Sequence, residues 1–274
     1  MKTSISTATL FWIPFERTLD LITKAGFQNI ELDLFWERKD WCMAQHLRII
    51  PAKQAVRRIE ASGLTITSIH DTGGVLESVD STTGFVDPVL DNYLDVMGHA
   101  PDCLVFHTPH VEGIVEDGWF NRISRELVKC LEKYRKVSPI SIENMQVFDG
   151  YTVPLNTPGP LKSFVDEYGL GVTLDTSHYT QMGVDIIQAA SVLGSSIKTI
   201  HLSDCIKEKR HVFIGEGDLD LPGLLKAIDR AKLIAVNLEC TLSTCDKSDQ
   251  DMDDDELVER LAQARIRMED YLST

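Results

Sequence analysis

Residues 171–178, GVTLDTSH, show the pattern from which the fold of this chain can be predicted. A short apolar and β-branched run ends at Asp175, and His178 follows it. Residues 197–204, IKTIHLSD, form a similar run that contains His201 near its end. Short apolar runs bounded by polar residues are typical of buried strands in a parallel sheet. Both segments are therefore predicted to be strands with polar side chains at their carboxyl ends.

The rest of the chain repeats this alternation of short strands and longer helical segments. The predicted strands cover residues 4–7, 29–34, 64–70, 103–107, 140–144, 171–175, 197–202 and 233–239. Apolar residues at three- and four-residue spacing predict helices between them, for example at 15–25, 52–62, 119–134 and 161–168. Repeated βα units of this kind predict a parallel sheet covered by helices.

The number of units and the chain length favour a closed barrel. The chain has 274 residues, 43% of them hydrophobic, and no Gly/Ser/Pro-rich linker divides it. An open doubly wound sheet is the alternative, but the first strand leads into TATLFWIP and not into a GxGxxG turn. We therefore predict an α/β fold, a single (β/α)8 TIM barrel in which residues 1–274 form one domain.

Charge and cysteine usage limit the classes of partner. The chain carries 42 acidic and 27 basic side chains, a net charge of −15, which disfavours binding to nucleic acid or to an anionic membrane. Its six cysteines form no CxxC pair, so that neither a zinc knuckle nor a disulfide scaffold is indicated. We predict a cytoplasmic protein with a small-molecule partner; assembly into a homo-oligomer is left open.

The carboxyl ends of the predicted strands carry imidazoles and carboxylates. They are His70, His107, Glu143, Asp175, His201 and Glu239. One histidine at a strand end is more often a hydrogen-bonded core residue than a ligand. Several such groups meeting at one barrel rim would stay unsatisfied unless a cation held them. We predict a divalent metal, with Mn, Zn or Co suiting these ligands and Mg or Fe as alternatives, and expect no organic cofactor.

These motifs resemble the xylose isomerase-like TIM barrel superfamily, which contains sugar isomerases and epimerases, sugar dehydratases and endonuclease IV. The resemblance covers nearly the whole chain. The matching pieces are IEN at Glu143, DTSH at 175–178, IHLSD at His201, RHVFIGEGDLD at 210–220 and NLE at Glu239.

The isomerase and epimerase branch implies one ion held by Glu143, Asp175, His201 and Glu239. The resemblance further implies that Glu143 and Glu239 move protons on and off carbon through a metal-stabilised enediolate, while His178 orients a substrate hydroxyl. The same superfamily implies a sugar-acid or polyol dehydratase as an alternative.

The endonuclease IV branch implies more than one ion and a different reaction. His70 and His107 would hold a second metal together with Glu143, and His178 and His211 match part of a third site. Lys209 stands where that third site has an acid, and an ammonium group cannot ligate a cation. A metal-dependent phosphodiesterase that acts at abasic DNA sites is therefore the second hypothesis.

Aromatic and basic residues near the predicted rim are candidates for substrate binding. Trp12 and Trp36, with Phe35, Trp41 and Trp119, follow predicted strands and could stack on a sugar ring or pack against one another. Arg210 and Lys207 could bind a phosphate or carboxylate, or form surface ion pairs. A third hypothesis is a barrel that binds a sugar or an ion without turnover, although two glutamates flanking an ion argue against it.

Overall fold

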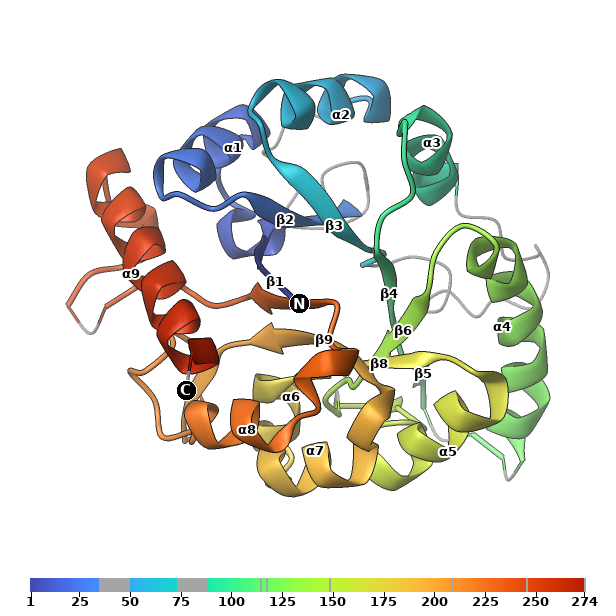
Figure 1. Ribbon diagram of the computed structural model, residues 1–274. Helices are drawn as coiled ribbons and strands as arrows, with labels where there is room; N and C mark the ends of the chain where they lie inside the picture. The colour runs from blue at the N-terminus through green and yellow to red at the C-terminus, as the bar shows by residue number, and fades with distance from the viewer. Residues whose placement is uncertain are drawn as a thin grey trace.

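Eight parallel strands close into a barrel in the computed structural model of the chain (Figure 1). Around the barrel the order is β1 (Lys2–Ser6), β12 (Ala235–Leu238), β9 (Ile197–Leu202), β8 (Gly171–Asp175), β6 (Ile140–Glu143), β4 (Cys103–His107), β3 (Thr65–His70) and β2 (Asn29–Asp33). The first and last strands are paired, with Ile5 opposite Leu238. The predicted (β/α)8 fold and all eight predicted strands are confirmed.

The structure describes residues 1–34, 50–72, 88–113, 115–116, 118–147, 149–207, 209–244 and 246–273. Phe35, Trp36 and Trp41, which the sequence suggested as stacking residues, lie outside these ranges. No disulfide joins the cysteines within them, Cys103, Cys130, Cys205 and Cys240.

Helices surround the strands, as the βα pattern predicted (Figure 1). They are α1 (Phe15–Lys24), α2 (Ala52–Ala61), α3 (Pro88–Val96), α4 (Trp119–Arg135), α5 (Pro158–Tyr168), α6 (Thr176–Gln181), α7 (Ile186–Leu193), α8 (Leu221–Ala227) and α9 (Asp254–Ser273). Gly169 ends α5 with a φ of 64°, a left-handed conformation that a glycine adopts without steric cost. The C-terminal helix α9 packs against α1 and α8 and so covers the junction where the barrel closes.

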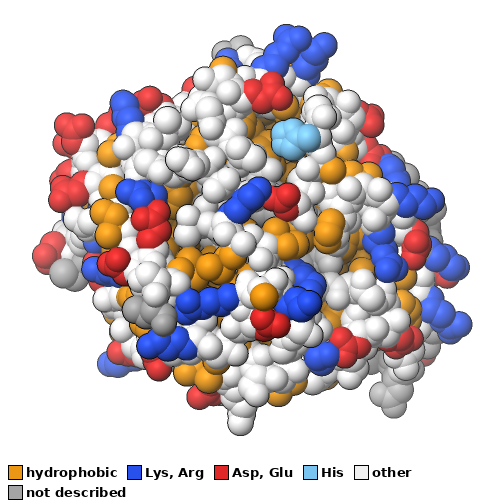
Figure 2. All heavy atoms as spheres, viewed as in Figure 1, with side chains coloured by type: hydrophobic (Ala, Val, Ile, Leu, Met, Phe, Trp, Pro, Cys, Tyr) orange, Lys and Arg blue, Asp and Glu red, His pale blue; other side chains and the backbone are white. Residues whose placement is uncertain are grey.

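The surface seen in Figure 2 carries charges of both signs. Lysine and arginine side chains are interspersed with aspartates and glutamates on this face, and the described side chains there form no basic stripe. Of the helices in the described ranges, none combines the length and the apolar character needed to cross a membrane.

Two antiparallel two-stranded sheets that the sequence did not predict lie outside the barrel sheet, and the second of them is a hairpin. One pairs β5 (Val111–Glu112) with β7 (Tyr151–Thr152), and the other pairs β10 (Asp204–Ile206) with β11 (Lys209–Val212). Strands of two to four residues are too short for side-chain alternation to reveal them. The β10–β11 hairpin matters for the site because β11 carries His211, which has a positive φ of 48°.

A polar layer fills the barrel below the strand ends. Alternate residues of a strand face the same side, so that residues two positions before the rim side chains also point inward. Among them, Thr173 Oγ1 lies 2.6 Å from Ser141 Oγ and 2.7 Å from Thr199 Oγ1, and all three residues are fully buried. Bulky branched residues usually fill this part of a TIM barrel. Here small hydroxyl side chains satisfy one another and occupy less volume.

Asp204 holds the loop that leads from the β10–β11 hairpin into α8. Its carboxylate accepts hydrogen bonds from the backbone amides of Cys205 (2.9 Å), Gly215 (3.0 Å) and Leu219 (3.0 Å). The side chain is almost completely buried, so this loop is fixed from within. The IGEGDLD segment therefore forms the turn that leads into α8, with Asp220 as its N-cap.

We expect Gly217→Ala to destabilise the fold through this loop. A Cβ atom at Gly217 would overlap the Asp204 carboxylate and lie 2.6 Å from the carbonyl oxygen of Cys205. The free energy of unfolding, measured by urea denaturation, should fall by about 1–3 kcal/mol. Gly98→Ala is the control, because a Cβ there meets nothing within 4 Å. Equal losses in both variants would contradict this role of the loop.

Candidate metal centre

A cavity of about 650 Å³ opens at the carboxyl ends of the barrel strands. The predicted site residues that line it are Trp12, His70, His107, Glu143, His178, Arg210, His211 and Glu239. Asp175 and His201 are completely buried beside them. Of the predicted site residues, Trp36 lies outside the described chain, as do Phe35 and Trp41. The barrel therefore brings together side chains that are far apart in the sequence.

Glu143, at the end of β6, lies between four imidazoles. Its Oε2 atom is 3.0 Å from His70 Nε2 and 3.3 Å from His107 Nε2. Its Oε1 atom is 3.2 Å from His178 Nδ1 and 3.3 Å from His201 Nδ1. The side chain is only 1% exposed, so these imidazoles are its main source of charge compensation. Glu143 is therefore the central acidic group of the cluster.

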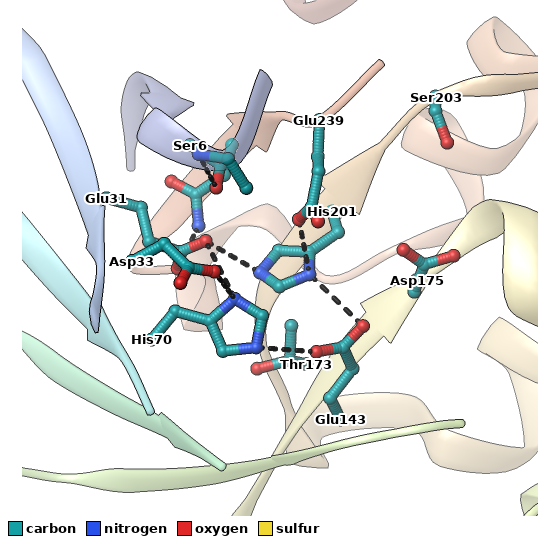
Figure 3. Close-up of polar contacts among 12 residues, drawn as sticks. Ser6, Glu31, Asp33, His70, Glu143, Thr173, Asp175, His201, Ser203 and Glu239 are labelled. Carbon is teal, nitrogen blue, oxygen red and sulfur yellow. Dashed lines mark hydrogen bonds and ion pairs between the residues drawn. The ribbon is translucent and has the colours of Figure 1, made fainter. Parts of the chain in front are cut away.

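The other predicted ligands converge on the same place. Glu239 Oε2 lies 2.9 Å from His201 Nδ1, the atom that also faces Glu143 (Figure 3). Asp175 caps the short helix α6 by accepting a 2.7 Å hydrogen bond from the amide of His178 through Oδ1. Candidate ligand atoms of Glu143, Asp175 and His201 all lie within 4.8 Å of one another. Three of the four residues that the sequence predicted as one ligand set thus form one cluster, and Glu239 adjoins it through His201.

Unsatisfied atoms show that this donor set fits a divalent ion. Within the described chain, Glu143 Oε2, Asp175 Oδ2, His201 Nδ1 and Glu239 Oε2 are buried without a hydrogen bond. Leaving such atoms unpaired is costly. Two atoms that each ligate one ion at about 2.1 Å, at right angles, lie about 3.0 Å apart. The distances of 2.9 and 3.3 Å from His201 Nδ1 to the two glutamates are consistent with this spacing.

The charged groups shift one another's pKa values strongly. Burial lowers the pKa of His201, but Glu239, Glu31 and Glu143 outweigh it and raise that pKa well above its ordinary value. Burial raises the pKa of Glu143, but the imidazoles of His201 and His107 hold it well below its ordinary value. Against the same effect of burial, His201 lowers the pKa of Glu239 to about 2. The residues therefore pair as imidazolium and carboxylate, and a cation that binds them must displace protons.

Beside the first cluster lie a group of Glu31, His70, His201 and Glu239 and two clusters whose histidines the sequence analysis had named. Ligand atoms of His70, His107 and Glu143 lie within 4.8 Å of one another, as the resemblance to endonuclease IV implied. Asp175, His178 and His211 form the other cluster. In that cluster Asp175 supplies the acid, whereas Lys209, in the position where the family has one, is exposed on β11.

Two acidic residues of β2 belong to the site, although the sequence analysis did not select them. Asp33 lines the cavity, and its Oδ2 atom lies 3.3 Å from His70 Nδ1. Glu31 is completely buried, and its Oε1 atom lies 2.8 Å from His201 Nε2. The signal was present in the segment NIELD, where two acids occupy alternate positions of an otherwise apolar strand. Alternate positions face one side, so both acids had to point into the barrel.

The wall of the cavity combines aromatic and basic side chains. The rings of Phe11 and Trp12 meet edge to face with centroids 5.4 Å apart, and both line the cavity. Arg210 is the only lysine or arginine that lines it within the described chain. His211 is held in place because its Nδ1 atom lies 3.1 Å from the carbonyl oxygen of Glu239. An apolar face and a single cation are thus available to a ligand in the cavity.

Comparison with known proteins agrees with this architecture. The profile of the family described as xylose isomerase-like TIM barrel matches residues 19–263. The chain belongs to this family. The resemblance predicted from IEN, DTSH and IHLSD is therefore confirmed. No curated protein matches the sequence.

Solved structures of ketose epimerases share the fold of this family member. An L-ribulose 3-epimerase is 19% identical with a TM-score of 0.70, over 99% of this chain and 94% of the other. A D-psicose 3-epimerase in the presence of D-fructose is 14% identical with a TM-score of 0.70, over 100% of both chains. A D-psicose 3-epimerase with D-tagatose from Clostridium cellulolyticum H10 is 16% identical with a TM-score of 0.67, over 99% of both chains. At these identities the likeness concerns the fold.

The pKa shifts predict how the stability of the metal-free protein depends on pH. Burial lowers the pKa of His70, His178 and His201, but neighbouring carboxylates outweigh it and raise all three above 6.5. The folded chain then binds more protons than the unfolded chain above this pH, so its free energy of unfolding falls as the pH rises. We expect the urea midpoint of metal-stripped protein to decrease from about pH 6.5 upward.

His201→Asn is the control for this pH dependence, because it removes the imidazole with the strongest upward shift. Its urea midpoint should decrease less steeply over the same interval. A midpoint of the unsubstituted protein that rises with pH in this interval would show that the sign of the shifts is wrong.

Proposed function

We propose that this protein is a divalent-metal-dependent epimerase or isomerase of a sugar or sugar derivative. The observation that carries the proposal is the placement of Glu143 and Glu239, which both face His201 Nδ1 at the cavity. Asp175 completes the proposed ligand set of Glu143, Asp175, His201 and Glu239. The 3-epimerase names of the similarly folded proteins support the same class of reaction.

The two glutamates would move protons on the substrate. When bound, a divalent ion would polarise a carbonyl group and stabilise the negative charge that develops on its oxygen. One glutamate would take the proton from the carbon next to that carbonyl, and the other would return a proton to the opposite face. The pKa of Glu239 is lowered to about 2, mainly because His201 opposes the effect of burial, so this group is a carboxylate at neutral pH.

Other residues of the cavity would bind and orient the substrate. His178 Nδ1 is held by the carbonyl oxygen of Asn144 at 3.0 Å, so that the rest of its ring faces the cavity. Trp12 offers an aromatic face to a sugar ring, while His211 and Arg210 offer polar groups. We propose a small polyhydroxy ketose or its derivative as the substrate.

Glu239→Gln and Glu143→Gln test the proton-transfer roles. We expect kcat to fall by about 10²–10⁴-fold in each variant, because a carboxamide cannot accept the proton. Conversion of D-tagatose, D-fructose, D-psicose and L-ribulose is measured together with deuterium uptake from D2O into the sugar carbon. Glu216→Gln, which removes a carboxylate that pairs with Arg260 near the surface, is the matched control. Full turnover by Glu239→Gln on the identified substrate would refute this role.

A two-metal phosphodiesterase is the second candidate function. The observation that favours it is the approach of both His70 Nε2 and His107 Nε2 to Glu143 Oε2, at 3.0 and 3.3 Å. Such a cluster could hold a second ion, and pairs of ions are suited to the hydrolysis of phosphate esters. The acidic net charge of −15 argues against a polyanionic substrate.

The number of bound ions separates the two candidates. For the epimerase we expect one tightly bound ion per chain, which His201→Ala removes and His107→Ala leaves in place. Elemental analysis of the purified protein and both variants measures this. Two ions, one of them lost in His107→Ala, together with incision of an abasic-site oligonucleotide, would favour the phosphodiesterase.

We also propose that residues 1–274 form one domain. The pairing of β1 with β12 supports this, because strands from the two ends of the chain complete one closed sheet.

A further inference from the structure

Glu31 lies one layer below the proposed ligands and reaches across the barrel interior. Its Oε2 atom accepts a 2.7 Å hydrogen bond from Ser68 Oγ on β3 and another of 2.7 Å from Asn237 Nδ2 on β12. Glu31, Ser68 and Asn237 are all completely buried. Two donors, one on β3 and one on β12, thus fix one oxygen of the carboxylate and determine where the other oxygen points.

The second oxygen of Glu31 faces His201. Oε1 lies 2.8 Å from His201 Nε2 and 3.9 Å from His70 Nδ1 (Figure 3). Nδ1 of His70 pairs with a different carboxylate, because it lies closer to Asp33, at 3.3 Å, than to Glu31. Glu31 is therefore the carboxylate that pairs with Nε2 of His201.

Both nitrogens of His201 face carboxylates, and a divalent ion between Nδ1 and the two glutamates would leave Nε2 as the nitrogen that carries hydrogen. A carboxylate only accepts hydrogen bonds, so the nitrogen that faces Glu31, Nε2, has to be the donor. When the imidazole is neutral, its remaining lone pair is then on Nδ1. That atom faces Glu143 and Glu239, at 3.3 and 2.9 Å.

We propose that Glu31 is a positioning residue that holds His201 as the Nε2–H tautomer, with the Nδ1 lone pair presented to a divalent ion. The inference rests on the proposed function only in that His201 is taken as a metal ligand. A carboxylate that accepts the second N–H of a ligating histidine fixes its ring and increases its basicity, and its loss typically costs about 10–100-fold in metal affinity.

The zinc-loaded, otherwise unaltered protein gives the first test. Long-range ¹H–¹⁵N correlation spectra of the histidine side chains report which nitrogen of His201 is protonated and which is ligated. We expect a slowly exchanging proton on Nε2 and a metal-shifted Nδ1. A ligated or unprotonated Nε2 overturns the proposal. Because this spectrum needs no substitution at Glu31, the test does not depend on how well a variant folds.

Glu31→Gln gives the second test, through the metal affinity. A carboxamide can donate as well as accept, so it no longer restricts the proton of His201 to Nε2. We expect the Kd for Zn²⁺, measured by competition with a chelator, to rise about 10–100-fold. Ser141→Ala is the matched control, because it removes a buried hydroxyl of the same layer that bonds Thr173 and not Glu31 or His201. Its effect on Kd should be clearly smaller.

The outcomes separate this proposal from the proposed function. An unaltered protein that binds no divalent ion would overturn the metal site and, with it, the role of Glu31. An unaltered protein that binds the ion through His201, combined with an unchanged Kd in Glu31→Gln, would overturn the role of Glu31 alone. Circular dichroism and the melting temperature of each variant show that the comparison is made on folded protein.

Discussion

Compensation of buried charge at the barrel rim is the constraint on which the rest of this structure depends. Glu31, Asp33, Glu143 and Asp175 are almost completely buried. Carboxylates can remain charged in such a place only when cations or several donors surround them. The imidazoles of His70, His178 and His201 supply part of that compensation, from the ends of β3 and β9 and from α6. A parallel barrel is suited to this because it directs all its carboxyl ends to one rim.

The layer beneath the rim gives the site its rigidity. Ser141, Thr173 and Thr199 bond to one another in the barrel interior, where branched apolar side chains are usual. The same layer holds Glu31 through Ser68 and Asn237. An imidazole that is fixed from below has fewer orientations to lose when it binds a ligand, so less of the binding free energy is spent on ordering it. The polarity of this layer thus contributes to the chemistry above it and not only to the packing of the barrel.

The sequence predicted the parts of this molecule that repeat and missed the parts that depend on tertiary contacts. The eight strands were predicted because each is an apolar run with a polar end, and their ends identified Glu143, Asp175, His201 and Glu239. The β10–β11 hairpin was missed because its strands are short and its turn contains Lys207, a non-glycine residue with a positive φ of 52°. Glu31 was missed because it lies two residues before the end of β2, and the strand-end pattern selects only the last residues of a strand. Its partner, His201, comes from β9 on the other side of β1 and β12, and no local pattern reveals that contact.

The same residues can be read as a one-ion or a two-ion site, and the contacts of His70 bear on the choice. Both of its nitrogens face a carboxylate, Nδ1 toward Asp33 at 3.3 Å and Nε2 toward Glu143 at 3.0 Å. Burial lowers the pKa of His70, but Glu143 and Asp33 outweigh it and raise that pKa above its ordinary value. A protonated His70 would then supply a positive charge where a second ion would otherwise be needed, and both of its N–H groups would have acceptors. Its ligation of a second ion would require the loss of the proton that these two carboxylates stabilise.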